Sequence, residues 1–224
     1  MLKGRGILSS LQKAFIKLFV DLPDQEFFYL TGGTALAEYY LGHRISYDLD
    51  LFTSQPDLIL PFSYHVEQSA RKSGFQNSVV RRFASFVEFQ ASRGDDQLKV
   101  DLALDSAFRL VPVELSDVGV LVNDFLDLQA DKALAFFGRV EPRDAIDLYF
   151  LLQLTPFDEL VELARQKDSS FDLYWFAIAL NRAAKFPDEI KRWPVKMLIE
   201  FDPVELKRDL QALAMRIMSN LTES

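Results

Sequence analysis

The sequence contains no cysteine and only two histidines, His43 and His65. The absence of cysteine excludes disulfides and thiolate metal sites, and it favours a cytoplasmic location. Two histidines are too few for a histidine-based metal cluster. The chain also lacks any apolar run of the ~20 residues that a membrane-spanning helix requires, so we expect no membrane partner.

Basic residues are in deficit, because 25 Lys and Arg face 33 Asp and Glu and give a net charge of −8. Non-specific binding of a polyphosphate through overall charge is therefore not expected. A local positive strip could still bind nucleic acid, with Arg81, Arg82 and Arg93 as candidates, or the acidic surplus could face a basic partner. The remaining composition, 49% hydrophobic and 26% charged, is typical of a globular protein.

The hydrophobic periodicity changes near the middle of the chain. It predicts an α+β domain over residues 1–122 and an all-helical domain over residues 123–224. The strand-like runs of the first domain are "EFFYL", "YDLDLF", "NSVVRRF", "SFVEFQAS" and "LKVDLAL". The aromatic-rich "FDLYWFAIAL" of the second domain has helical spacing. We therefore expect it to be core rather than a base-stacking surface.

Three aspartates lie on the polar faces of two predicted strands. Asp48 and Asp50 alternate with leucines in "YDLDLF", and Asp101 has the same place in "LKVDLAL". Carboxylates held this close repel each other unless a cation lies between them. Mg²⁺ or Mn²⁺ fits, because Mg²⁺ takes carboxylate oxygens together with substrate phosphates. If the two strands are neighbours, three acids suit a two-metal phosphoryl or nucleotidyl transfer.

A Gly-Gly turn precedes this strand in "LTGGTALAEYYLG". Gly32 and Gly33 let the backbone approach a phosphate closely, and Thr34 opens a helix whose N–H groups point toward that anion. Each of these elements has a simpler explanation when it is considered alone. The Gly-Gly pair can be an ordinary turn, the Asp-x-Asp pair can belong to a solvated strand face, and Asp101 can be a carboxylate on an edge strand. Their joint order favours a nucleoside triphosphate site.

Two stretches resemble a known family. "GGTALAEYYLGHRISYDLDLF" resembles the signature of the AbiEii/AbiGii-type nucleotidyltransferases, the toxins of type IV toxin–antitoxin systems within the DNA polymerase β-like superfamily. "LQADKALAFFGRVEPRDAIDLYFLL" resembles the same family, in which a helix lysine precedes an Arg-Asp-x-x-Asp helix. Together they span residues 28–152, and no motif in the helical tail after residue 156 resembles a family that we can name.

The resemblance implies a polymerase β-like mixed sheet with helices, and a helical C-terminal domain that closes over the cleft. It implies that Gly33 and Thr34 cradle phosphate and that Asp48 and Asp50 bind the metal. Asp101 would take the position of the third carboxylate. Arg44 could offset the acidic site or reach a phosphate, and His43 is interpreted as a structural hydrogen-bonding residue.

In the second stretch, the resemblance implies that Lys132 contacts nucleotide phosphate and that Asp144 or Asp147 completes the site. The residues alone allow another explanation. Asp144 follows Pro142 in the first turn of a helix, where negative charge is favourable, and Arg143 and Asp147 have the spacing of an ion pair. A lysine on a largely apolar helix face can also extend to solvent.

The resulting hypothesis is a Mg²⁺-dependent nucleotidyltransferase that moves a nucleoside monophosphate from an NTP to an acceptor hydroxyl. In the family context the acceptor is RNA, such as a tRNA end, and a cognate antitoxin is the partner. Two alternatives are a transferase that modifies a small molecule or a protein, and a non-catalytic module that binds nucleotide or antitoxin.

Overall fold

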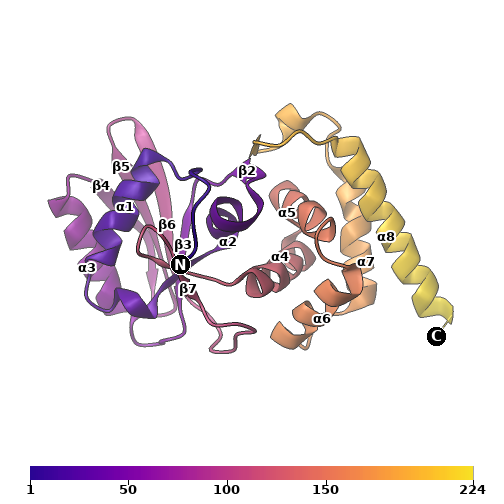
Figure 1. The fold of residues 1–224 in the computed structure, drawn as a ribbon, viewed down its shortest axis with the longest axis horizontal. Coiled ribbons are helices and arrows are strands. Elements are labelled where there is room, and N and C mark those ends of the chain that lie inside the picture. Colours follow the sequence, from indigo (N-terminus) through magenta and orange to yellow (C-terminus); the bar gives the residue numbers. More distant parts are fainter. Residues whose placement is uncertain (224) are drawn as a thin grey trace. The chain divides into compact units, whose positions relative to one another are not determined.

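The structure is a computed structural model that describes residues 1–223, and it divides into two compact units, Met1–Phe125 and Leu126–Ser224. The first unit contains a mixed sheet with helices, and the second consists mainly of helices (Figure 1). The α+β class predicted from the sequence is confirmed.

The sheet of the first unit has the strand order β4-β5-β6-β3-β1-β8-β7. Its strands are β1 (Tyr29–Thr31), β3 (Leu49–Thr53), β4 (Gln76–Phe83), β5 (Phe86–Arg93), β6 (Asp96–Leu104), β7 (Glu114–Leu115) and β8 (Leu121–Val122). β3 runs parallel to β6 and β1 parallel to β8, while the other pairs are antiparallel. β4 and β5 form the predicted hairpin, and a short strand β2 (Arg44–Ile45) lies outside this sheet.

Alternation along the strands gives the sheet one apolar face and one polar face. Leu49 and Leu51 of β3 are level with Val100 and Leu102 of β6, and all four are fully buried or nearly so. The residues between them, which include the candidate metal ligands, therefore point to the opposite face. The strand order thus brings two of the three predicted acids onto neighbouring strands.

Helices α1 (Ser10–Val20) and α3 (Ile59–Lys72) pack beside the sheet (Figure 1). α1 begins at a capping box, in which the Ser9 side chain accepts from Gln12 N–H and the Gln12 side chain accepts from Ser9 N–H. The two glycines of the Gly-Gly turn are the first residues of α2 (Gly32–Ala35), which continues as the π-helix η2 (Leu36–Leu41). Gly42 ends it in the left-handed conformation, as a C-terminal glycine commonly does. A short 3₁₀ helix, η1 (Gln25–Phe27), precedes β1.

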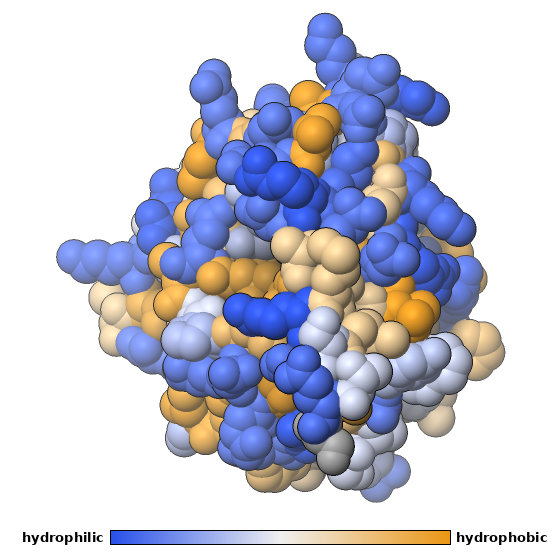
Figure 2. Space-filling model, turned by 90° about the vertical axis from the view of Figure 1, so that its right-hand side faces the viewer, coloured by the Kyte–Doolittle hydropathy of each residue, from blue (hydrophilic) through white to orange (hydrophobic). Residues whose placement is uncertain are grey.

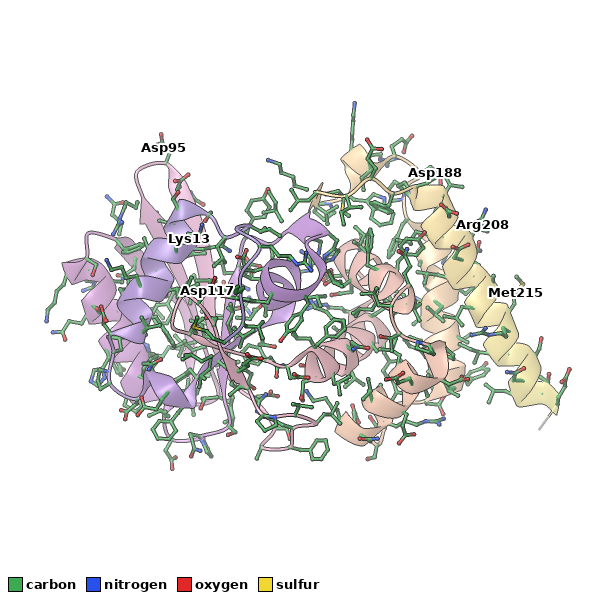
Figure 3. The ribbon with its side chains drawn as sticks, in the orientation of Figure 1. Lys13, Asp95, Asp117, Asp188, Arg208 and Met215 are labelled. Atoms are coloured by element: carbon green, nitrogen blue, oxygen red, sulfur yellow. The ribbon has the colours of Figure 1, made fainter. Side chains whose placement is uncertain are left out.

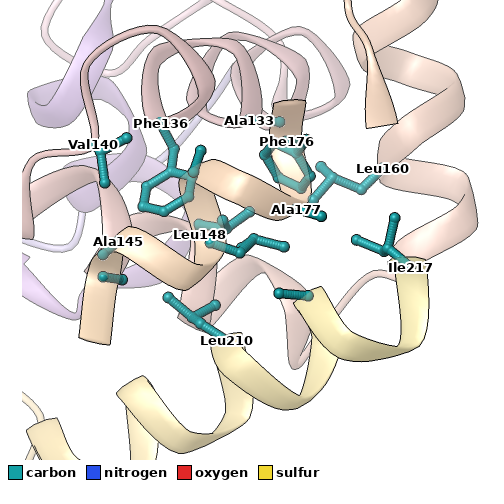
Figure 4. Packing of buried hydrophobic residues seen from close by; sticks show 14 of the residues in the cluster. Ala133, Phe136, Val140, Ala145, Leu148, Leu160, Phe176, Ala177, Leu210 and Ile217 are labelled. Carbon is teal, nitrogen blue, oxygen red and sulfur yellow. The ribbon is translucent and has the colours of Figure 1, made fainter. Parts of the chain in front are cut away.

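The second unit is built from helices that surround one apolar core (Figure 4). They are α4 (Phe125–Arg139), α5 (Pro142–Leu152), α6 (Phe157–Lys167), α7 (Leu173–Arg182), η3 (Ala183–Lys185), η4 (Ile190–Arg192) and α8 (Pro203–Glu223). Phe136 and Phe176 meet edge to face with ring centroids 6.0 Å apart, and Leu148, Leu210 and Ile217 pack in the same core. The predicted helical character is confirmed, apart from the two-residue strand β9 (Lys196–Met197).

The aromatic stretch of α7 is only partly core. Phe176 is 1% exposed, whereas Trp175 is 61% exposed and Tyr174 is half-exposed. The prediction that this stretch is core therefore holds for one face of the helix only, because a helix turns successive side chains to different faces. Met215 of α8 also points away from the core (Figure 3). The face in Figure 2 accordingly shows hydrophobic patches between hydrophilic residues. None of the helices in residues 1–223 is long and apolar enough to cross a membrane.

Candidate active site

The Gly-Gly turn lies directly against one of the candidate metal ligands. Thr31, at the end of β1, is the register partner of Asp50 in β3. The next residue, Gly32, has φ +69°, and a Cβ atom there would lie 2.0 Å from Asp50 Oδ2. Glycine is therefore required at this position both for the backbone conformation and for the space that the carboxylate occupies.

Asp50 and Asp101 are neighbours across the parallel β3–β6 pair. Asp48 precedes β3 by one residue, so strand alternation directs it to the face of Asp50. Asp101 is buried, and its Oδ2 lies 2.5 Å from Lys99 Nζ. Its other oxygen, Oδ1, is buried and has no hydrogen-bond partner within the described residues. The three predicted acids thus lie on one face of adjacent strands.

Burial and the closeness of the charged groups shift the pKa values of Asp101 and Lys99. Burial raises the pKa of the Asp101 carboxyl above its ordinary value, and the Lys99 ammonium only partly opposes that shift. Burial alone would lower the pKa of Lys99, but the carboxylates of Asp101, Asp48 and Asp50 raise it above its ordinary value. Lys99 is not among the site residues predicted from the sequence, although it stands two residues before Asp101 on the same face of the predicted strand.

The donor set fits a hard divalent cation that is completed by substrate. Within residues 1–223 no group of three or more His, Asp or Glu side chains is placed to hold a metal ion. Mg²⁺ does not need such a cage, because it is usually bound by one or two carboxylates together with phosphates and water. Asp48 and Asp50 supply oxygen ligands of this kind, and the buried Oδ1 of Asp101 is a further oxygen on the same face.

Polar residues around the turn fix the main chain that carries these aspartates. The Thr34 hydroxyl donates to the Asp48 carbonyl, and Gln12 Nε2 donates to the Ser46 carbonyl at 3.0 Å. A Cβ atom on Gly33 would lie 2.7 Å from Arg44 Nη2 and 2.9 Å from Ser46 Oγ. The Thr34 hydroxyl therefore positions the Asp48 backbone, and its contact with phosphate stays a prediction. Arg44 lies beside the turn.

A second set of contacts holds the turn from the other side, and no pattern in the sequence indicates it. Asn123 Nδ2 donates to Thr31 Oγ1 at 3.1 Å, and Arg109 Nη1 donates to Asn123 Oδ1 at 2.6 Å. The Tyr40 hydroxyl donates to the Asn123 carbonyl at 3.0 Å. Asn123 directly follows β8, a strand of two residues that hydrophobic alternation cannot reveal in a sequence.

In the helical unit the candidate residues form two separate ion pairs, of which only one is buried on both sides. Lys132 of α4 lies 2.9 Å from Asp147 Oδ2 of α5, and both side chains are almost completely buried. Asp144 instead accepts from Arg139 at 2.6 and 2.7 Å. The structure therefore brings Lys132 together with Asp147 rather than with Asp144. Contact of Lys132 with a nucleotide phosphate stays a prediction.

The proposed positive strip is partly neutralised by neighbouring groups. Arg82 pairs with Glu67 at 2.5 Å, and its guanidinium lies 4.1 Å from the centre of the Tyr64 ring. Arg81 lies 3.7 Å from Glu88, and Arg93 donates to the Ser73 carbonyl at 2.6 Å. RNA contact through these arginines stays a prediction. His43 is fully buried.

The chain is similar to known proteins both in sequence and in fold. The model of a family described as "Nucleotidyl transferase AbiEii toxin, Type IV TA system" matches residues 15–223. An uncharacterised protein of Aquifex aeolicus is 27% identical over 192 residues, which cover 81% of this chain and 84% of that protein.

Two solved structures have a similar fold. MenT4, a nucleotidyltransferase toxin of Mycobacterium tuberculosis, superposes with a TM-score of 0.61 at 16% identity, and the match covers 93% of this chain and 82% of that one. JHP933 of Helicobacter pylori superposes with a TM-score of 0.58 at 20% identity, over 95% and 91% of the two chains. At these identities the likeness concerns the fold.

Proposed function

Because the chain belongs to the AbiEii nucleotidyltransferase toxin family of type IV toxin–antitoxin systems, we propose that it transfers a nucleoside monophosphate from an NTP to an acceptor hydroxyl. The observation that carries the proposal is the contact between the Gly-Gly turn and the acidic strand face. Gly32 and Asp50 are in van der Waals reach of each other, and Asp101 is beside Asp50 on the next strand. Phosphate-binding backbone and cation-binding carboxylates therefore occur together.

Each residue at this point has a chemical role in the proposal. The N–H groups at the start of α2 bind the triphosphate, and the adjacent Arg44 guanidinium adds positive charge. Asp48 and Asp50 hold Mg²⁺. When bound, Mg²⁺ neutralises charge on the phosphates and lowers the cost of releasing pyrophosphate.

The chain's own part in the transfer is to position the groups and to accept a proton. The acceptor oxygen forms a bond to the α-phosphorus while the bond from that phosphorus to the bridging oxygen breaks. The electron pair of the broken bond leaves with pyrophosphate. Asp101 accepts the proton of the acceptor hydroxyl, and the buried Oδ1 that lacks a hydrogen-bond partner among the described residues supports this role.

We further propose RNA as the acceptor, with the reaction taking place in the cytoplasm and a cognate antitoxin controlling it. The family description supports the toxin role and an antitoxin partner. The net charge of −8 suits a small molecule or a protein side chain slightly better than RNA as the acceptor, because an acidic chain repels a polyphosphate. A module that binds nucleotide without turnover is the remaining alternative.

The test is incubation of the full chain with Mg²⁺, total cellular RNA and each α-labelled NTP in turn. We expect label on RNA with the wild type and a loss of at least about 100-fold with Asp48→Asn/Asp50→Asn, since a transition state stabilised by the cation loses its ligands. The matched control is Asp95→Asn/Asp96→Asn, in which exposed Asp95 lies in the turn between β5 and β6 (Figure 3) and exposed Asp96 is the first residue of β6.

The distribution of label separates the candidates. Label on protein or on a small molecule would replace RNA as the acceptor and leave the reaction class intact. If no label moved while NTP still bound, the non-catalytic module would be the better account.

A further inference from the structure

Lys99 places a positive charge beside the three carboxylates of the candidate site. Its Nζ lies 2.5 Å from Asp101 Oδ2, and Asp48 and Asp50 are close enough to act electrostatically on the same ammonium. Asp101 therefore has one oxygen bound to Lys99 and one without a partner among the described residues. A carboxylate bound in this way has one oxygen left for any other cation.

The strand register explains why Lys99 reaches this position. Asp50 is level with Asp101 in the parallel pair of β3 and β6, and Leu49 is level with Val100. Continuing the register by one residue puts Asp48 level with Lys99. Residues that are level on neighbouring strands, and that are an even number of positions apart along one strand, share a face. Lys99 thus occupies the fourth corner of a group whose other corners are Asp48, Asp50 and Asp101.

The carboxylates do not form an all-protein cage for a cation. No three His, Asp or Glu side chains within residues 1–223 are placed to hold a metal ion. A two-metal site brings two divalent ions to about 3.5–4 Å from each other, with carboxylates bridging them. An ammonium already bound to the third carboxylate repels a second divalent ion from that place.

We propose that the Lys99 ammonium takes the place of a second divalent cation, so that the site accepts one Mg²⁺ ion. The single ion is held by Asp48 and Asp50 together with phosphate oxygens, and Lys99 supplies the second positive charge beside Asp101. This inference rests on the proposed function, and it revises the two-metal arrangement expected from the sequence.

The test counts ions and does not depend on turnover. Mn²⁺ replaces Mg²⁺ and tripolyphosphate replaces the NTP, and electron paramagnetic resonance records Mn²⁺ bound to the full chain. The wild type is expected to bind one isolated ion. Lys99→Met, which keeps the length of the side chain but removes its charge, is expected to bind a second ion and to give the spectrum of a spin-coupled pair. Lys99→Arg and the exposed control Lys72→Met are expected to match the wild type.

Two results would overturn the inference and leave the proposed function standing: a spin-coupled pair in the wild type, or a single isolated ion in a folded Lys99→Met. Binding of no Mn²⁺ by any variant would count against both, because the proposed reaction requires the ion. Circular dichroism of each variant establishes that it is folded before ions are counted.

Discussion

Replacing Lys167 by methionine is expected to lower the free energy of unfolding by about 3–5 kcal/mol, the range found when one partner of a buried ion pair is removed. Lys167 of α6 lies 2.8 Å from Asp127 and 2.6 Å from Asp131, both in α4. The Asp127 side chain is fully buried, so loss of the ammonium leaves its charge in a medium of low polarity. Urea denaturation of the full chain measures the effect.

Two control variants separate this charge effect from a general loss of packing. Lys191→Met, at an exposed position, is expected to change the free energy of unfolding by less than about 0.5 kcal/mol. Adding Asp127→Asn to Lys167→Met is expected to recover part of the loss, because the buried charge is then removed. If Lys167→Met unfolded at the same urea concentration as the wild type, the ion pair would not stabilise the helical unit.

The same pair also predicts a pH dependence. Burial alone would lower the pKa of Lys167, but Asp131 and Asp127 raise it above its ordinary value. A lysine with a raised pKa in the folded state stabilises fully below its unfolded pKa of about 10.4 and loses that contribution as pH rises through the folded pKa. The difference between wild type and Lys167→Met should therefore be constant near neutral pH and shrink at strongly alkaline pH.

Gly32→Ala is expected to reduce nucleotidyl transfer by about 100-fold or more. The new Cβ atom would lie 2.0 Å from Asp50 Oδ2, so the carboxylate must move, and displacement of a catalytic group by about 1 Å can cost that much. The backbone at Gly32 has φ +69°, where an alanine costs about 1–2 kcal/mol. The measurement is the initial rate of label transfer from NTP, together with the free energy of unfolding.

Gly74→Ala is the matched control for this substitution. Gly74 has φ +80°, and a Cβ atom there would meet no described atom within 4 Å, so alanine brings the backbone strain without contact to the site. We expect Gly74→Ala to lose stability through backbone strain alone and to keep its activity, whereas Gly32→Ala must also displace Asp50 and loses activity. Equal transfer rates for both would show that the turn does not hold Asp50 in place.

Local signals in the sequence predict much of the fold. "FLDLQADKALAFFGR" coincides with α4, and Gly42 ends the helix after the Gly-Gly turn in the left-handed conformation. The alternation in "YDLDLF" and "LKVDLAL" places Asp50 and Asp101 on one polar face. These features follow from helical period, strand period and the conformational freedom of glycine, which all act over a few residues.

Features that depend on strand order or on distant contacts were beyond such signals. Arg109 holds Asn123, which in turn holds Thr31, a residue 92 positions away. Lys167 reaches Asp131 across 36 positions, and no local pattern marks it as buried. Local signals could not predict that β3 and β6 are neighbours, because "NSVVRRF" and "SFVEFQAS" lie between them in the sequence. They predicted only that the three aspartates form one site if the two strands are neighbours.

The most direct test of the central claim is the fate of the two ends of the triphosphate. The protein is incubated in parallel with an NTP labelled at the α-phosphate and with the same NTP labelled at the γ-phosphate. The account predicts that the α-label enters the acceptor and the γ-label appears only in pyrophosphate, and that both signals vanish in Asp48→Asn/Asp50→Asn. Entry of the γ-label into the acceptor would identify a different phosphoryl transfer and would contradict the assignment of the site as a nucleotidyltransferase centre.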